Sequence, residues 1–231
     1  MKGFATLLLL FVVASARANS PDNTRDEFWP EVDAYIDLNS VARIRLLGSF
    51  RNNQPAESWH GDFGAFLDVA LKPVFRRALR PREDVFDKRF LSFQSGFRYI
   101  SRLGAGPPYL EHRWIAELTA RYPLPGNFIL SDRNRGEFRF ISEMPLATRY
   151  RNKLQLERDF RMGRFVYTPY LNTELFYDTR YDAWVRNRYS AGVQVPVGGY
   201  VVFQPYYLRQ NQSRSSPAHM NAFGLELDFY F

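Results

Sequence analysis

Large apolar residues fill every second position in the last nine residues of the chain. They are Phe223, Leu225, Leu227, Phe229 and Phe231. Successive side chains of a β-strand point to opposite faces, so these five would share one face and Gly224, Glu226, Asp228 and Tyr230 the other. Soluble chains usually fray into water at their ends, whereas a strand between lipid and a polar lumen alternates in this way. The pattern predicts a transmembrane β-strand.

The same alternation recurs in ten earlier segments, separated by polar or Gly- and Pro-rich turns. The eleven segments cover 28–38, 43–51, 62–72, 91–99, 110–121, 128–140, 149–159, 165–178, 185–197, 200–210 and 223–231. Single-chain bacterial barrels normally have an even number of strands. We therefore predict an all-β fold, an antiparallel transmembrane β-barrel of about 12 strands, with 10 as the alternative. A missing strand would lie near 72–89, or the N-terminal arm would pass through the lumen. Segment 128–140 alternates poorly.

The turns predict how the barrel is oriented. Bacterial barrels have short periplasmic turns and longer outer loops. Counting back from the last strand makes Asn39-Ser40, Pro123 to Asn127, Met162-Gly163 and Gly198-Gly199 periplasmic. The longer connections 101–108, 141–147, 179–183 and 211–219 then become outer loops. Segment 72–89 does not fit, because it would be a long periplasmic loop.

The first 18 residues have the features of an export signal. Lys2 precedes the apolar run 4–14, and Ala16-Arg17-Ala18 forms a cleavage site. The run is too short to span a membrane as a helix. We expect a signal peptide at 1–18 and one barrel domain at 19–231. The chain has no Cys, which excludes disulfides and thiolate chemistry, and its Arg residues are interleaved with acids throughout, which disfavours nucleic-acid binding.

Several short motifs occur along the mature chain. They are Phe28-Trp29-Pro30-Glu31, the segments 130–135 and 150–157, Tyr167-Thr168-Pro169-Tyr170, and the segments 174–178, 184–188 and 207–210. Together they resemble the domain of unknown function 2490 family, putative outer-membrane proteins of Gram-negative bacteria. The resemblance covers nearly all of the mature chain. It implies a barrel and a bacterial outer-membrane location, and it carries over no catalytic residues. A terminal Phe, here Phe231, is also similar to the signal read by the barrel-insertion machinery.

Charged residues on three consecutive predicted strands would face the lumen. This lumen charge cluster comprises Arg149, Arg151, Lys153, Glu157, Glu174, Arg186 and Arg188. Charges inside a low-dielectric wall must be paired or hydrated. The cluster fits a salt-bridged plug, since barrels of this size fill much of their interior with side chains. It also fits a narrow pore whose excess of Arg favours anions.

Two further groups of residues suggest contacts with outer-membrane lipids. Aromatic residues near strand ends could form a headgroup girdle, or could pack inside a soluble sandwich. These are Trp59, Tyr99, Trp114, Tyr167, Tyr177, Trp184, Tyr189 and Tyr230. Arginines in or near the outer loops could bind lipopolysaccharide phosphates, or could be scattered solvated charge. These are Arg180, Arg186, Arg188, Arg209 and Arg214.

One pair of residues allows an enzyme hypothesis. Ser101 and His112 would lie nearly opposite each other on the outward face, as in the dyad of an outer-membrane lipid acyl hydrolase. Asn134 is the candidate residue to orient the His. The simpler interpretation is a non-catalytic pair, with His112 at the membrane interface and Ser101 in a loop. His60 and His219 have no helpers at suggestive spacing. Three His and no Cys predict no metal site, and no cofactor motif is present in the sequence.

The sequence leaves three hypotheses. The first is a monomeric outer-membrane barrel, exported through the periplasm, acting as a narrow channel or as a structural envelope protein. The second is the acyl hydrolase using Ser101 and His112. The third is a soluble periplasmic, lipocalin-like binder, which would require the apolar rows to point inward.

Overall fold

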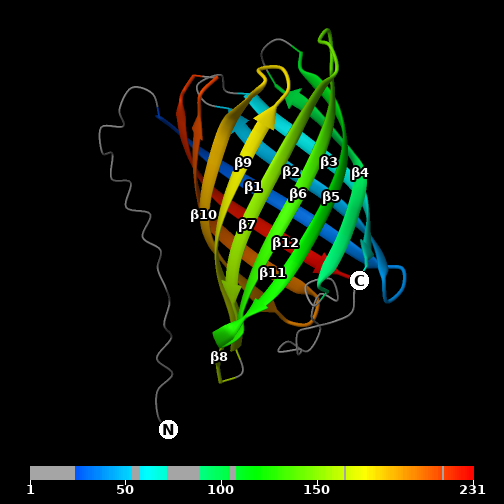
Figure 1. Ribbon diagram of the computed structural model, residues 1–231, viewed down its shortest axis with the longest axis vertical. Helices are drawn as coiled ribbons and strands as arrows, with labels where there is room; N and C mark the ends of the chain where they lie inside the picture. Colours follow the sequence, from blue (N-terminus) through cyan, green and yellow to red (C-terminus); the bar gives the residue numbers. More distant parts are fainter. Residues whose placement is uncertain (1–23, 54–57, 72–88, 105–107, 164, 215) are drawn as a thin grey trace.

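The protein is a closed, tilted β-barrel (Figure 1). The computed structural model describes residues 24–53, 58–71, 89–104, 108–163, 165–214 and 216–231. The predicted signal peptide at 1–18 and most of segment 72–89 lie outside the described residues. In the part of the chain described, no helix is long and apolar enough to cross a membrane.

The described residues form twelve strands. They are β1 (Thr24–Asp37), β2 (Ala42–Asn53), β3 (Ser58–Ala70), β4 (Leu91–Leu103), β5 (Leu110–Leu124), β6 (Phe128–Ile141), β7 (Ala147–Arg158), β8 (Phe160–Met162), β9 (Phe165–Asp178), β10 (Ala183–Val197), β11 (Val201–Gln212) and β12 (His219–Tyr230). Strands of 12 to 15 residues are longer than the 9 to 11 that a tilted strand needs to cross a bilayer. Their ends can therefore project beyond the hydrocarbon.

Eleven of the described strands close the barrel, and β8 extends β9 as a short hairpin. Neighbouring strands are antiparallel except at the closure, where β1 and β12 pair in parallel from Thr24↔His219 to Tyr35↔Tyr230. This follows from the odd count, because strands that alternate up and down leave the first and last of eleven pointing the same way. The seam continues to the last residue, where the Phe231 amide donates to the Tyr35 carbonyl at 2.9 Å.

The hairpin connections divide between two rims of the barrel. We call the rim at the end of β12 the lower rim and the opposite one the upper rim (Figure 1). The predicted short turns all lie at the lower rim, at 38–41, 125–127, 163–164 and 198–200. Gly126 (φ 78°) and Gly198 (φ 67°) supply left-handed backbone there. At the upper rim β2, β4, β6, β9 and β11 end, and β3, β5, β7, β10 and β12 begin. β3 ends and β4 begins at the lower rim.

The predicted alternation of apolar and polar faces is confirmed, with apolar rows outward. On β1, Val32 is 45% exposed while Asp33 is 0% exposed, and on β9 Leu171 is 63% exposed. Phe97, Leu67 and Phe63 extend the same outer surface over β3 and β4. The soluble-binder hypothesis needed these rows inside. A largely apolar outer surface of this kind is typical of a transmembrane barrel.

The lumen contains two small apolar clusters within a mainly polar interior. Trp29, Leu208, Met220 and Ala222 pack together near the seam, with Tyr206 against them. Leu47, Phe66 and Ile115 form the second cluster. Gly224 on β12 allows the first cluster to close, because a Cβ there would lie 1.9 Å from the Tyr206 ring. Most of the remaining buried side chains are charged or amide groups.

Candidate functional site

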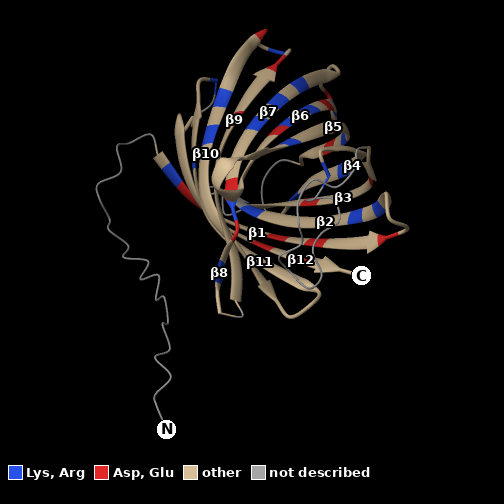
Figure 2. Cartoon of the chain, turned by 60° about the horizontal axis from the view of Figure 1, so that its bottom comes forward, with Lys and Arg blue, Asp and Glu red and all other residues tan. Residues whose placement is uncertain are grey.

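The lumen encloses a polar cavity of about 350 Å³, lined by residues of all eleven barrel strands. Its described lining includes ten Lys and Arg side chains and seven Asp and Glu side chains. Figure 2 shows acidic and basic residues recurring along β1, β6 and β7. The alternation that puts apolar rows outside therefore concentrates opposite charges inside, with cations in excess.

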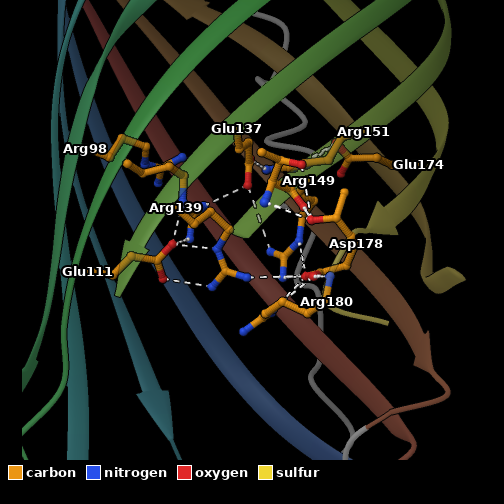
Figure 3. A network of polar contacts seen from close by, with 12 residues as sticks. Arg98, Glu111, Glu137, Arg139, Arg149, Arg151, Glu174, Asp178 and Arg180 are labelled. Carbon is orange, nitrogen blue, oxygen red and sulfur yellow. Dashed lines mark hydrogen bonds and ion pairs between the residues drawn. The ribbon is translucent and has the colours of Figure 1, made fainter. Parts of the chain in front are cut away.

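A network of ion pairs follows the wall from β5 to β9 (Figure 3). Its centre is Glu137 on β6, which is 1% exposed. The Arg151 guanidinium lies 2.8 Å from the Glu137 carboxylate, Arg113 lies 3.3 Å away and Arg149 lies 3.9 Å away. One fully buried carboxylate thus compensates parts of three guanidinium charges, as buried charges require.

A second part of the network lies at the upper rim, where β5 begins and β9 ends. Arg139 donates to both oxygens of Glu111 at 2.6 and 2.9 Å. Asp178 accepts from Arg149 at 2.8 Å and from Arg180, in the following turn, at 2.8 Å. These hydrogen bonds to Asp178 raise the pKa of Arg180, so this guanidinium stays charged at the rim. Glu111, Arg139 and Asp178 lie outside the described cavity lining, and they occupy the upper part of the wall.

Glu174 on β9 connects this network to the cavity. Its carboxylate is 2.5 Å from Arg133, 2.8 Å from Arg151 and 3.8 Å from Arg188. Arg133, Arg151, Arg188 and Glu174 all line the cavity. Arg133 also has Glu117 at 3.5 Å and Arg151 also has Glu137 at 2.8 Å, so Arg188 has the weakest counter-charge of the three.

Four arginines lie over two aromatic rings in the lumen. One of them, Arg151, lies 4.6 Å from the centre of the Phe176 ring and is already paired with Glu137 and Glu174. The other three form a group with the two rings. The Arg51 guanidinium carbon lies 4.3 Å from the centre of the Trp29 ring, and that of Arg188 lies 5.1 Å from the same centre. Arg188 is also 4.8 Å from the centre of Phe176, and Arg186 is 5.4 Å from it. We call these five residues the arginine–aromatic cluster. Cation–π contacts hold the three guanidinium groups in place without neutralising them.

The inner face of the seam is acidic. Glu31 and Asp33 on β1 lie in register with Glu226 and Asp228 on β12. Carboxylate oxygens of Glu31, Asp33 and Glu226 lie within 4.8 Å of one another. Arg45 compensates part of this charge, at 2.5 Å from Asp33 and 3.6 Å from Glu31. Carboxylate oxygens are ligands that could hold a hard cation. The prediction of no metal site considered only His and Cys, so it did not include these carboxylates.

The predicted lumen charge cluster is brought together by the fold. Arg151, Lys153, Glu157, Glu174 and Arg188 line the cavity. Arg149 bonds to Asp178 at the upper rim, and Arg186 faces Phe176 inside the barrel. Two acidic partners of these arginines, Glu137 and Asp178, were not part of the predicted cluster, because their contacts depend on the register between neighbouring strands.

The fold does not assemble a catalytic triad around Ser101. Ser101 is opposite Leu110 and His112 is opposite Tyr99, so Ser101 and His112 are diagonal neighbours about 7–8 Å apart at Cα. The His112 ring instead packs edge-on against Tyr99 at 5.4 Å. Asn134 pairs with Leu118, six residues along β5 from His112, which is about 20 Å at the rise of a strand. Asn134 is therefore too far away to orient His112.

The predicted lipid-contacting residues divide between the outside and the lumen. Tyr230 of the predicted girdle lines the cavity and stacks on Tyr35 at 4.8 Å, because it belongs to the inward-facing set of β12. Arg186 and Arg188 also point inward and cannot reach lipid headgroups. Arg209 points outward and donates to Asn221 at 2.8 Å, and Arg214 lies over the Tyr181 ring.

A polar group on the outer surface of β6 and β7 was not predicted. Asp132 accepts hydrogen bonds from Asn152 at 2.7 Å and from Asn134 at 3.2 Å. The Tyr150 hydroxyl donates to Asn134 at 2.5 Å. Asp132, Asn134 and Gly136 occupy outward positions, which explains why β6 alternates poorly although its inner face is regular. The four polar groups satisfy one another beside Leu118 and Leu154.

Comparison of the sequence with protein families gives one match. The model of the family described as "Protein of unknown function (DUF2490)" matches residues 79–221. The chain belongs to this family. The matched region runs from the segment before β4 into β12 and contains the ion-pair network of β5 to β9. No curated protein matches the chain.

Among solved structures, the fold is similar to the β domain of the Bordetella autotransporter BrkA. The sequence identity is 13% and the TM-score is 0.49. The alignment covers 81% of this chain and 84% of that chain.

Proposed function

We propose that the protein is a bacterial outer-membrane β-barrel that forms a narrow, anion-preferring passage. The observation that carries this proposal is the cavity at the centre of the lumen, with ten basic and seven acidic residues in its described lining. Excess positive charge in a confined, low-dielectric space raises the local concentration of anions and lowers that of cations.

The location is supported by the outer surface of the barrel. Apolar residues cover it through the middle of the strands, and Trp184, Tyr177 and Trp59 stand outward near the upper rim. Interfacial aromatics and an apolar outer band are the features of a barrel placed in lipid. The lower rim, with its tight turns, would face the periplasm. Contacts with lipopolysaccharide and with the barrel-insertion machinery belong to this proposal as expectations.

A closed structural barrel is the second candidate. The ion pairs from Glu111 to Asp178 favour it, because they fill the upper part of the wall with fixed side chains. A closed barrel would stabilise the envelope without conducting ions. The two candidates share the fold and differ in conductance.

The test is the conductance of the refolded protein in a planar bilayer with a KCl gradient. We expect small steps whose reversal potential shows chloride preference. The double variant Arg51→Glu and Arg188→Glu should shift the reversal potential toward potassium, and the only ion pair it removes among the described residues is Arg188–Glu174 at 3.8 Å. Arg209→Glu is the matched control, because Arg209 lies outside the lumen. A wild-type protein that inserts without conducting would establish the closed barrel instead.

A further inference from the structure

We propose that the arginine–aromatic cluster of Trp29, Arg51, Phe176, Arg186 and Arg188 is a binding site for a phosphate group. The site lies inside the lumen between β1, β2, β9 and β10. It deepens the proposed function, on which it rests, by naming the class of anion and the residues that hold it.

The first argument is the missing counter-charge. Within the described part of the chain, no carboxylate oxygen lies within 4 Å of Arg51 or Arg186. Arg188 has Glu174 at 3.8 Å, but that carboxylate is already 2.5 Å from Arg133 and 2.8 Å from Arg151. The Arg186 Nε is buried and has no hydrogen-bond partner among the described residues. Arg188 is 7% exposed, and Arg51 and Arg186 are half-buried. Burial of guanidinium groups without an anion is costly, so a bound anion would complete the site.

The second argument is geometry. The guanidinium groups of Arg51 and Arg188 share the Trp29 ring, and those of Arg186 and Arg188 share the Phe176 ring. Trp29 is 6% exposed and Phe176 is 1% exposed, so both rings are fixed by packing. The three guanidinium groups therefore lie around two fixed rings, with Arg188 over both of them, before any ligand arrives. Preorganised arginines lose little entropy when they bind.

The third argument is the chemistry of the donors. A guanidinium group presents parallel N–H donors that match two oxygens of a phosphate. Arg188 already donates its Nε–H to Gln210 at 2.6 Å, which leaves its terminal nitrogens for a ligand. Trp29, Arg51 and Arg188 line the cavity, so a small phosphate can reach these three residues from the lumen, whereas Arg186 and Phe176 lie behind the described lining. Chloride is a single atom, so it cannot accept the two parallel N–H bonds of a guanidinium group on two separate oxygens.

The test is titration of the detergent-folded protein with inorganic phosphate at constant ionic strength, with chloride as the competing salt, followed by calorimetry and by the thermal midpoint. We expect saturable binding and a higher midpoint. Arg51→Gln and Arg186→Gln should each weaken binding by about tenfold or more, as expected for loss of a charged hydrogen bond. Neither substitution leaves a described carboxylate without its ion pair, so both variants should fold.

Arg121→Gln is the matched control, because it removes one positive charge from the cavity lining outside the cluster. Binding that survives in this variant and is weakened in the other two supports the site. Equal effects of phosphate and chloride, or unchanged binding in Arg51→Gln and Arg186→Gln, overturn it. Conductance is measured separately, so a closed barrel that binds phosphate would refute the passage and leave this site intact.

Discussion

Glu31 on β1 and Glu226 on β12 lie opposite each other across the parallel seam that closes the barrel. Asp33 and Asp228 repeat this arrangement two residues further on. The seam therefore brings four carboxylates together, and Arg45 lies 2.5 Å from Asp33 and 3.6 Å from Glu31. Like charges placed directly opposite one another destabilise a sheet, more so in a low-dielectric interior.

Glu226→Gln should stabilise the protein. The amide keeps the shape of the carboxylate and removes one of the opposed charges, so we expect a gain of about 1 kcal/mol in the free energy of unfolding. Urea unfolding in lipid vesicles measures this free energy, with a chelator present so that no divalent cation binds the carboxylates. Glu157→Gln, on the inner face of β7, is the matched control. A loss of stability in Glu226→Gln would show that the seam is compensated by groups that the geometry does not identify.

Glu137→Gln should destabilise the barrel strongly. The substitution leaves Arg113, Arg149 and Arg151 facing a neutral amide, and breaking a buried ion pair on one side costs about 3 kcal/mol or more. The temperature at which the folded band disappears in an unboiled gel is the readout. Asp26→Asn, at an exposed outer position where Asp26 accepts from Asn221, should change stability by less than about 0.5 kcal/mol. Equal unfolding temperatures for the two variants would show that the ion-pair network around Glu137 does not stabilise the barrel.

Leu171→Arg tests the outward apolar surface. Leu171 is the seventh of the 14 residues of β9 and is 63% exposed. A charge at the bilayer midplane costs a barrel about 2–4 kcal/mol, whereas one near the interface costs about 0–1 kcal/mol. Met162→Arg is the comparison near the interface, because Met162 lies on β8, outside the closed barrel wall, and is 66% exposed. Folding free energies in vesicles should separate the two variants. Similar small effects would indicate that water surrounds both positions.

Ser101→Ala and His112→Ala should leave any lipid hydrolysis by the purified protein unchanged. His112 packs on Tyr99, and Asn134 lies about 20 Å along the sheet, so the fold provides no oriented base for Ser101. Release of fatty acid from phospholipid and lipopolysaccharide vesicles is the measurement. Loss of a measurable activity in both variants would restore the hydrolase hypothesis.

The sequence predicts the wall of this barrel better than its closure. Rows such as Leu225 and Leu227 report their own orientation, because lipid requires an apolar side chain at every second position. The pairing of β1 with β12 joins residues almost 200 positions apart, and nothing local encodes that it is parallel. The alternation predicts eleven strands, and a twelfth was expected only because bacterial barrels usually have an even number of strands.

The candidate site also has one part that the sequence predicts and one part that it does not. The basic row from Arg149 to Lys153 is visible in the sequence because it occupies one inner face. Its acidic partners Glu137 and Asp178 lie on two other strands, and their contacts with the row depend on the register of β6, β7 and β9. The stacking of Arg51 on Trp29 and of Arg188 on both Trp29 and Phe176 spans the lumen, and periodicity along one strand carries no information about it.

The parallel seam has a practical consequence for membrane topology. β1 starts at the upper rim and β12 ends at the lower rim, so positions near Thr24 and near Phe231 must face different compartments once the barrel crosses a bilayer. The chain contains no Cys, so single thiols can be introduced at Asn39 and Asp182 without any competing native thiol. An impermeant maleimide applied to intact cells would then label one of these two rims and spare the other, which reads out the orientation directly.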